Sequence, residues 1–433
     1  MNFKLYSTFI KNVASALMLL AVFVTPTQAQ DWEQIYERPA TNAFYISRSG
    51  NFIVSDFVWD MTGGIYVSKN KGKTWTKTNA FDYQYNIFVE NDEYIFAAGC
   101  EARVVRSNDG GVTWETINYK SAVQEALGDQ ADYAMAYALT IHDGKLFLGE
   151  FQGGGIIYSE DNGETWKQTD ITSLSYGEPD PKTGKPAVEN IYNLVSYNGE
   201  LYAFGVYFVF RYLPDTNSWE VLRDDSNFMA ISAFYGGKLC LGRSVMNYTT
   251  EDAFVTTLDK NGEWGRIDHP TGTDDNNIRA MFGDAKGLYV GMASGKFYYT
   301  NDGKGWREKS EGLPANITPM NIQVDNDYIY LAAYQDPYAS TPHSGIHRIR
   351  RAALPLATGI EHAQTADNAV QFNGQSLIFN GKAQQTTIYD LNGRSTSINT
   401  SGNTVNVDGL SPGVYLYRSI INGKVVTGKF QKN

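Results

Sequence analysis

The 433-residue sequence contains only two cysteines, Cys100 and Cys240, and each lies in an apolar run typical of a strand. The repeats described below place these runs on opposite sides of a ring, whereas a disulfide requires Cα atoms within about 7 Å. We therefore expect two buried free thiols. No zinc-spaced Cys/His motif occurs either, so the sequence predicts neither a metal site nor a cofactor.

Long apolar runs are also missing, apart from one near the N-terminus. The run from Val13 to Val24 is shorter than the roughly 20 residues that span a bilayer. Lys4 and Lys11 flank it on one side, and Thr27-Gln28-Ala29 follows as a small-x-small site. This layout predicts a secretory signal at residues 1–29, cleaved after Ala29. An N-terminal membrane anchor is the alternative, and no transmembrane segment is expected in the remaining chain.

The chain is short of positive charge, with 36 Lys and Arg against 47 Asp and Glu and a net charge of −11. Two lysines fall in residues 1–29, and residues 356–433 carry six basic and four acidic side chains. Removing these two net charges of +2 from −11 leaves −15 for the middle of the chain. An acidic surface repels phosphate backbones, so we expect no nucleic-acid partner. The sequence also contains no basic amphipathic segment of the kind that binds a membrane surface.

What the sequence has in abundance is glycine and aromatic residues, with 41 Gly and 29 Tyr, which is typical of many short strands. A strand, a tight polar turn and a second strand recur seven times, and such turns supply the positive φ that two-residue hairpins need. The repeat predicts an all-β protein with a seven-bladed β-propeller at residues 30–351. The seven turns are Ser49-Gly50-Asn51, Asn91-Asp92-Glu93, Asp143-Gly144-Lys145, Asn198-Gly199-Glu200, Gly236-Gly237-Lys238, Ala285-Lys286-Gly287 and Asn326-Asp327.

A second motif, S-x-D-x-G-x-T-W, follows several of these hairpins. It covers Ser107–Trp114 and Ser159–Trp166, with Asn70 replacing Asp in Ser68–Trp75, and later copies decay. The Ser and Asp side chains can bind the backbone of a tight turn between the third and fourth strands, and the Gly can adopt positive φ. We expect the Trp to pack between neighbouring blades and the motif to be structural.

This motif resembles the Asp-box, or BNR, repeat of sialidases, sortilin-like receptors and several glycan-active propellers. In those families it lies on the rim, away from the central site. The last repeat unit, residues 321–351, has three strands and no Trp, whereas Trp32 follows the expected signal. We therefore expect the N-terminal strand to complete the last blade and close the ring.

The sequence changes character after Arg351. Residues 352–369 form a weakly patterned linker, and residues 370–433 contain three signatures: Ile388–Arg394, Val407–Tyr415 and Gly428–Phe430. Their order and spacing resemble the C-terminal sorting domain of the type IX secretion system of Bacteroidetes. The resemblance implies a small β-sandwich-like domain that engages the type IX secretion machinery and is removed after export. A small sandwich-like binding module is the alternative.

A ligand is expected on the face that carries the blade-to-blade loops and the loops between second and third strands. These loops are rich in aromatic and charged residues that could stack on sugar rings and bind hydroxyl groups, although many tyrosines can instead pack loops onto the ring. The candidate ligand-binding residues are Trp59, Tyr85, Arg103, Tyr133, Tyr207, Arg243 and Tyr338.

Catalysis is the alternative for the same face. The Arg-Ile-Pro signature of sialidases is absent and seven blades differ from their six, so a sialidase is not expected. A polysaccharide lyase would need a base such as His343 with an arginine that neutralises a uronate, for which Arg103 and Arg243 are candidates. An inverting glycoside hydrolase would need two carboxylates about 6.5–9.5 Å apart, and Glu101 and Glu150 are candidates.

The sequence thus predicts a secreted or surface-attached monomeric propeller that binds a polysaccharide or a surface or host protein. A polysaccharide-degrading enzyme and a scaffold in a surface complex are the alternatives. A tight cluster of titratable groups would favour the enzyme, and a flat aromatic platform would favour the binding module.

Overall fold

The computed structural model describes two compact units, Met1–Leu354 and Pro355–Asn433, and each is treated by itself. Within them the described residues are 31–38, 41–56, 63–179, 181, 184–224, 231–242, 254–268, 277–335, 344–354, 370–372, 375–379, 382–389, 395–398, 402–421 and 424–432. No helix in these ranges is long and apolar enough to cross a membrane.

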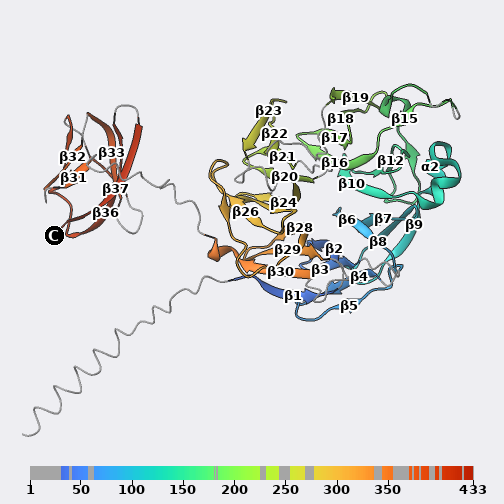
Figure 1. Ribbon diagram of the computed structural model, residues 1–433, viewed down its shortest axis with the longest axis horizontal. Helices are drawn as coiled ribbons and strands as arrows, with labels where there is room; N and C mark the ends of the chain where they lie inside the picture. The colour runs from blue at the N-terminus through green and yellow to red at the C-terminus, as the bar shows by residue number, and fades with distance from the viewer. Residues whose placement is uncertain are drawn as a thin grey trace, which may run out of the picture. The chain divides into compact units, whose positions relative to one another are not determined.

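Four-stranded antiparallel sheets build the first unit, and all but the last run outward through four consecutive strands of the chain. Figure 1 shows the sheets side by side around a common centre, which is the arrangement of a β-propeller. The described strands form seven such sheets. They are β2(Thr41–Ile46) to β5(Thr76–Lys77) through β3(Phe52–Asp56) and β4(Gly64–Ser68); β6(Tyr85–Glu90), β7(Ile95–Gly99), β8(Arg103–Ser107) and β9(Glu115–Asn118); β10(Ala136–His142), β11(Lys145–Glu150), β12(Ile156–Ser159) and β13(Lys167–Gln168); β16(Ile191–Tyr197), β17(Glu200–Gly205), β18(Val209–Leu213) and β19(Ser218–Arg223); β20(Ile231–Tyr235), β21(Lys238–Gly242), β22(Phe254–Leu258) and β23(Trp264–Asp268); β24(Ile278–Asp284), β25(Gly287–Met292), β26(Phe297–Thr300) and β27(Arg307–Glu308); and β28(Thr318–Val324), β29(Tyr328–Tyr334), β30(Gly345–Arg350) and β1(Glu33–Glu37).

The last of these sheets is completed by the first strand of the chain. β1 pairs antiparallel with β30, with Glu33 opposite Arg348 and Glu37 opposite Gly345. Trp32 is buried, and its Nε1 donates to the carbonyl of Lys309 at 2.7 Å. A Cβ at Gly345 would overlap the carbonyl of Tyr36, so only glycine fits beside the closing strand. The expected joint between the N-terminal strand and the last sheet is confirmed.

The turns between third and fourth strands have the geometry expected from the sequence motif. Ser107 Oγ donates to Asp109 Oδ1 at 2.8 Å, and the same Oδ1 accepts from Thr113 N at 2.9 Å. Gly111 N in turn donates to Ser107 Oγ at 2.9 Å. Residues 68–74 and 159–165 repeat these bonds, with Asn70 accepting in place of an aspartate. The polar residues therefore satisfy the backbone of the turn.

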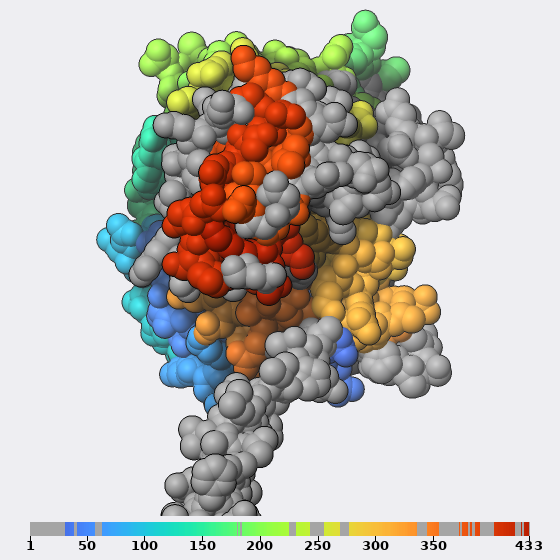
Figure 2. Space-filling model, turned by 90° about the vertical axis from the view of Figure 1, so that its left-hand side faces the viewer, coloured from blue at the N-terminus to red at the C-terminus, as the bar shows by residue number. Residues whose placement is uncertain are grey.

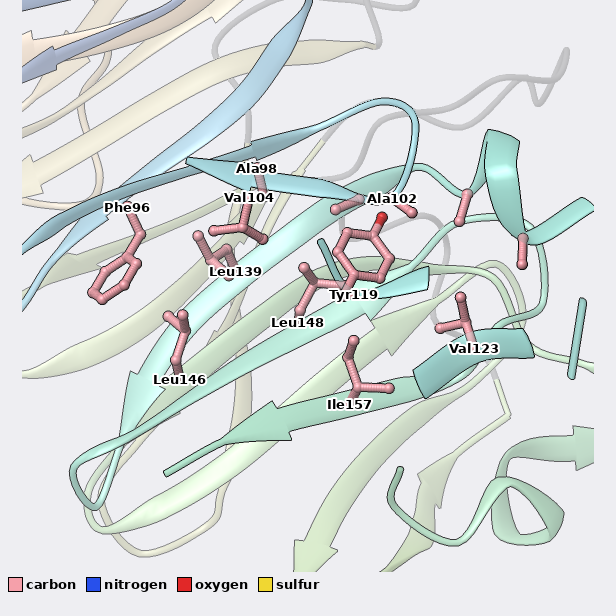
Figure 3. Packing of buried hydrophobic residues seen from close by; sticks show 13 residues of the cluster. Phe96, Ala98, Ala102, Val104, Tyr119, Val123, Leu139, Leu146, Leu148 and Ile157 are labelled. Atoms are coloured by element: carbon pink, nitrogen blue, oxygen red, sulfur yellow. The ribbon is translucent and has the colours of Figure 1, made fainter. Parts of the chain in front are cut away.

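Hydrophobic clusters fill the space between neighbouring sheets. Trp114 packs with Ile53, Val67 and Phe88, which belong to two successive sheets. The next interface, shown in Figure 3, joins Phe96 and Val104 to Leu139, Leu148 and Ile157. It continues into the connection between the sheets through Tyr119 and Val123, the latter on helix α2(Lys120–Leu127). The loops are thus part of the same core as the sheets beneath them.

Two details of this unit differ from expectation. Cys240 is buried and Cys100 only half-buried, and both thiols are free. The unit also extends past Arg351, because residues 351–353 form the short 3₁₀ turn η3(Arg351–Ala353) and Leu354 is buried in the last interface. The rest of the expected linker 352–369, from residue 355 onward, lies outside the described residues.

The second unit is a small β structure with its own core. Figure 2 shows the surface of its described residues in orange-red to red. One sheet contains β31(Val370–Phe372), β32(Ser376–Phe379) and β35(Thr404–Asn406), and the other contains β34(Ser395–Ile398), β33(Ala383–Tyr389), β36(Gly413–Ile421) and β37(Lys424–Lys432). Leu377, Phe379, Val405, Tyr417 and Phe430 are buried together. All three sequence signatures supply residues to this core, namely Ile388, Val407 and Phe430.

Substitution of Gly111 tests how tightly the turns fit against the neighbouring sheet. Gly111 has φ 85°, and an added Cβ would collide with Cδ1 of Ile53. Gly144 also has a positive φ, 75°, but nothing lies within 4 Å of its Cβ position. Both alanine variants incur the cost of a left-handed alanine, about 1 kcal/mol, but only Gly111→Ala adds a clash. We expect Gly111→Ala to lower the melting temperature by several degrees more than Gly144→Ala. Equal losses would contradict this packing.

Candidate functional site

One end of the first unit carries the loops, and the other carries the tight turns. Each sheet turns from its first to its second strand and from its third to its fourth strand at the same end, so the other connections share the opposite end. We call that end the loop face. Its described segments in the second to fourth sheets are residues 78–84, 100–102, 119–135, 151–155, 169–179, 184–190 and 206–208.

The first strands of six sheets contain a β-bulge close to the loop face. Their registers shift by one residue, which leaves Asn42, Asn86, Tyr137, Tyr192, Arg279 and Met320 as the extra residues. Asn42 Nδ2 donates to Asn86 Oδ1 at 2.9 Å, and Asn86 Nδ2 donates to the carbonyl of Ala136 at 3.0 Å. Bulges redirect side chains and are frequent beside functional sites. Here the side chains of the bulge residues Asn42 and Asn86 link successive sheets around the inside of the ring.

A charged and aromatic group occupies the loop face of the second sheet. The Arg103 guanidinium lies 4.0 Å from the centre of the Phe81 ring, and its Nη1 is 3.0 Å from Glu101 Oε2. Tyr83 stacks on Phe81 with ring centres 6.0 Å apart. Burial, with the hydrogen bond to Glu101, raises the pKa of Tyr83 to about 12. Phe81 nevertheless remains 49% exposed, so an accessible ring is held in a fixed position.

The turn that presents Glu101 has an unusual backbone. Glu101 and Ala102 have φ values of 58° and 51°, a region that costs a non-glycine residue roughly 1–3 kcal/mol. The neighbouring connection holds this turn, because Ala102 N donates to Ala134 O at 2.8 Å and Tyr119 N donates to Ala102 O at 2.9 Å. Backbone strain of this kind is concentrated at functional sites.

Aromatic residues continue across the third and fourth sheets. Phe151 contacts Tyr137 and Tyr192, with ring centres 4.7 Å and 5.1 Å apart. Next to them Tyr176 lies 5.3 Å from Tyr207. These side chains come from first strands and loops that are distant in sequence. Together with the group around Phe81 they give the loop face a series of partly exposed rings.

The remaining candidate residues divide into three groups. Tyr133 and Tyr207 are 64% and 52% exposed on the loop face. Tyr85 is buried, and its hydroxyl donates to the carbonyl of Phe81 at 3.2 Å, so its ring supports the loop from inside. Trp59, Arg243, Tyr338 and His343 lie outside the described residues.

Glu150 differs from the sequence-based expectation of a catalytic carboxylate. The residue is fully buried and accepts hydrogen bonds from the backbone N–H groups of Met135, Gln152 and Gly154. Glu101 and Arg103, by contrast, are brought together, but they neutralise each other. Across the described residues, no three His, Cys, Asp or Glu side chains are grouped so that they could hold a metal ion.

Sequence reasoning missed a buried carboxylate at the ring closure. Asp56, at the end of β3, accepts from the hydroxyl of Tyr36 in β1 at 2.8 Å, and Arg38 Nε lies 3.6 Å away. Burial raises the pKa of Asp56 to about 7, although Tyr36 and Arg38 act in the opposite direction. The available signal was an aspartate at the end of an otherwise apolar strand. Phe81 was missed for another reason, because a single aromatic in a loop gives no signal of exposure.

No protein-family model and no curated protein matches the chain. Solved β-propeller structures do resemble it. The extracellular domain of a one-component system from B. thetaiotaomicron has a TM-score of 0.51 at 13% identity, over 92% of this chain and 48% of that protein. YCF48, bound to a D1 peptide, has a TM-score of 0.52 at 14% identity, over 74% of this chain and 94% of its own. Virginiamycin B lyase from Staphylococcus aureus has a TM-score of 0.55 at 12% identity, over 73% of this chain and 98% of its own. These similarities establish the β-propeller fold.

The raised pKa of Asp56 predicts how the closure responds to pH. A folded-state pKa of about 7 exceeds the ordinary 3.8, so the folded protein binds a proton that the unfolded chain has released. The contribution of Asp56 to the free energy of unfolding is therefore complete below about pH 4 and is lost as the pH rises through 7. Asp56→Asn removes this dependence. Denaturant unfolding gives the difference in the free energy of unfolding between Asp56→Asn and the wild type. From pH 5 to pH 8 this difference should shift in favour of the variant by on the order of 2–4 kcal/mol. A difference that does not change with pH would contradict the assignment.

Proposed function

We propose that the chain is a secreted or cell-surface binding protein, a seven-bladed propeller in which each four-stranded sheet is one blade. Its loop face at blades two to four binds a glycan or a partner protein. The expected signal at residues 1–29 would direct export, and the C-terminal unit, as a type IX sorting domain, would be recognised by the secretion machinery and removed. The motif at the outer turns would be an Asp-box, with a structural role.

The observation that carries this proposal is the rigid aromatic platform around Phe81. Phe81 is half exposed, yet Arg103 covers part of its ring and Glu101 fixes Arg103. An ordered, accessible ring loses little entropy when a ligand stacks on it, which is the property of a binding anchor. Tyr133 and Tyr207 extend the accessible aromatic surface over the next two blades.

Both ligand classes fit this surface. Aromatic faces stack on sugar rings, and neighbouring carboxylates can bind hydroxyl groups. Tyrosine-rich surfaces also anchor protein partners, and the YCF48 propeller was solved with a peptide. A scaffold role in a surface complex is a form of the second possibility.

A polysaccharide-degrading enzyme has less support, although the lyase from Staphylococcus aureus shares the fold. Arg103 already has a carboxylate partner, so it is a poor group for neutralising a uronate. Glu150 is buried and bound to backbone N–H groups, which leaves it out of reach of a glycosidic bond. The remaining base and arginine candidates, His343 and Arg243, lie outside the described residues.

The test uses residues 30–433 in affinity gels that contain neutral or acidic polysaccharides, with assays for reducing ends and unsaturated products. Phe81→Ala removes the platform, and we expect it to weaken retardation about tenfold, which corresponds to about 1.4 kcal/mol.

Phe234→Ala is the matched control. Phe234 is also 49% exposed and stacks on Tyr197 at 6.0 Å, but it lies beside a first-to-second strand turn at the opposite end. Retardation that Phe81→Ala reduces and Phe234→Ala preserves supports a glycan site on the loop face. No retardation by any polysaccharide selects the partner-protein form of the proposal. Released products, or equal effects of the two variants, would overturn it.

A further inference from the structure

A fully buried carboxyl group lies beneath the loop face in the fourth blade. Glu189 connects β15(Ala187–Val188) to β16, and none of its surface is exposed. Its Oε1 accepts from Val206 N at 2.7 Å, in the loop between β17 and β18. Its Oε2 is also buried and has no hydrogen-bond partner among the described residues. Buried acidic groups are normally paired, so a partner is expected for this oxygen.

The described part of the chain supplies no cation to this group. The groups that act on the pKa of Glu189 include no Lys, Arg or His. Burial raises this pKa above the ordinary 4.5, and the backbone N–H groups of Asn190, Val206 and Tyr207 oppose the rise. A cation placed nearby would favour the ionised form of the carboxyl group.

Three aromatic rings gather beside Glu189. Tyr176, in β14(Ser175–Tyr176), has its ring centre 5.3 Å from that of Tyr207 and 5.8 Å from that of Phe208. The rings of Tyr207 and Phe208 are 6.3 Å apart. One cation can therefore lie within about 6 Å of all three ring centres, which is the range of a cation–π interaction. Tyr207 is 52% exposed and the other two rings are half-buried, so a ligand can reach them from the loop face.

The carboxyl group and the rings act together electrostatically. Burial, followed by the negative charge of Glu189, raises the pKa of Tyr176. The faces of aromatic rings are negative as well, so the rings and the carboxylate attract the same kind of ligand, a cation. We call Glu189, Tyr176, Tyr207 and Phe208 the Glu189 group.

Elsewhere the chain supplies its own cation to a ring beside a carboxylate. In the first blade the Arg38 guanidinium lies 4.3 Å from the centre of the Tyr66 ring, and its Nε is 3.6 Å from Asp56 Oδ2. The platform around Phe81 has the same pattern, because its guanidinium contacts both a ring and a carboxylate. Three more examples are Arg106 with Tyr94 and Glu115, Lys145 with Tyr158 and Glu160, and Arg348 with Tyr328 and Glu33.

The Glu189 group has the carboxylate and the rings of this pattern without the cation. Within the described ranges, no Lys or Arg side chain lies over Tyr176, Tyr207 or Phe208. In the five complete examples the cation is always a basic side chain. A basic side chain of another protein would therefore complete the arrangement.

Such a side chain suits the site better than an amino sugar does. The long stem of Lys or Arg can pack on the exposed Tyr207 ring while its charged end approaches Glu189. The amino group of a sugar is attached directly to a bulky ring and stays farther from the carboxylate. The excess of acidic residues in the chain would also steer a basic partner toward it.

We propose that the Glu189 group is a binding site for a lysine or arginine side chain of a partner protein, whose cation lies on the three rings above Glu189. This inference rests on the proposed function in its partner-protein form. It adds the chemistry that the partner must present and the blade that receives it.

Calorimetric titration of residues 30–433 with two synthetic peptides tests the chemistry. One probe is the pentapeptide Gly-Ser-Lys-Ser-Gly with blocked ends. The matched probe carries Nε-acetyllysine, which keeps the stem and removes the charge. We expect the wild type to bind the lysine peptide about tenfold more tightly than the acetylated peptide.

Two substitutions separate the site from the general charge of the molecule. Glu189→Gln removes the buried acidic group, whereas Glu178→Gln removes an exposed one from the same connection between β13 and β16. Both variants change the net charge equally, so only a local role of Glu189 makes them differ. We expect Glu189→Gln to weaken binding of the lysine peptide about tenfold and Glu178→Gln to change it less than about twofold.

A second pair of variants avoids any change in a buried residue. Tyr207→Ala removes an exposed ring of the Glu189 group and should weaken binding of the lysine peptide about fivefold. Phe234→Ala removes a similarly exposed ring at the opposite end and should leave the affinity unchanged. This pair decides the question if Glu189→Gln does not fold.

Equal binding of the two peptides, or equal effects within either pair of variants, would contradict the inference. Glucosamine oligosaccharides that bind in preference to their N-acetylated forms, while the peptides do not bind, would also overturn it and assign the site to an amino sugar. Neither result affects the affinity-gel test of the proposed function, which depends on Phe81 and on no cation. Released products in that test would contradict the proposed function whichever peptide binds.

Discussion

The hydrogen bonds between β1 and β30 are the constraint on which the first unit depends. Each interface between sheets buries side chains of the two sheets that it joins. If the two ends of the ring did not meet, the first and last sheets would each leave one face exposed to solvent. Here the meeting point joins the first described strand of the chain to the last sheet. Trp32 and Tyr36 anchor it, one to Lys309 in the preceding connection and the other to Asp56 in the first sheet. The closing strand therefore binds its neighbours on both sides.

A closed ring gives the loop face a rigid base. The second strands of the sheets beneath it are almost entirely buried, and the turn motifs secure the opposite end. Polar groups that lack a well-formed hydrogen bond are concentrated toward the loops, which is typical of sites that bind water or ligands. Six of the eight such buried atoms in the described residues lie near the loop face: Thr41 Oγ1, Asp56 Oδ1, Arg103 Nη1, Tyr119 Oη, Glu189 Oε2 and Asn193 Nδ2.

The repeating features of the fold could be predicted because local chemistry determines them. Asn-Gly and Asp-Gly turns require positive φ, and the side chains of Ser107 and Asp109 can only satisfy their own turn. The closure could be predicted because a three-stranded last unit needs a partner. The site could not, because exposure depends on how distant loops meet. Phe81 lies in the connection and Tyr85 begins β6 only four residues later, yet of these two aromatic residues only Phe81 reaches the surface.

The carboxylates illustrate the same limit. Glu150 looks like an accessible acid in the sequence, but a glycine four residues later lets the loop fold back over it. The bulges at Asn42 and Asn86 escaped prediction because a single extra residue leaves the alternation of a short strand unchanged. Such features depend on register between strands, which the sequence pattern of one strand does not contain.

Native-state hydrogen exchange in β1 is the most direct measurement of the central claim, that the N-terminal strand closes the ring. The amides of Gln34 to Glu37 that pair with β30 should exchange only with global unfolding, and should respond to low denaturant as the core strands β7 and β29 do. Exchange of β1 through independent fraying, while β7 and β29 stay protected, would show that the ring is stable without its closing strand and would contradict the account.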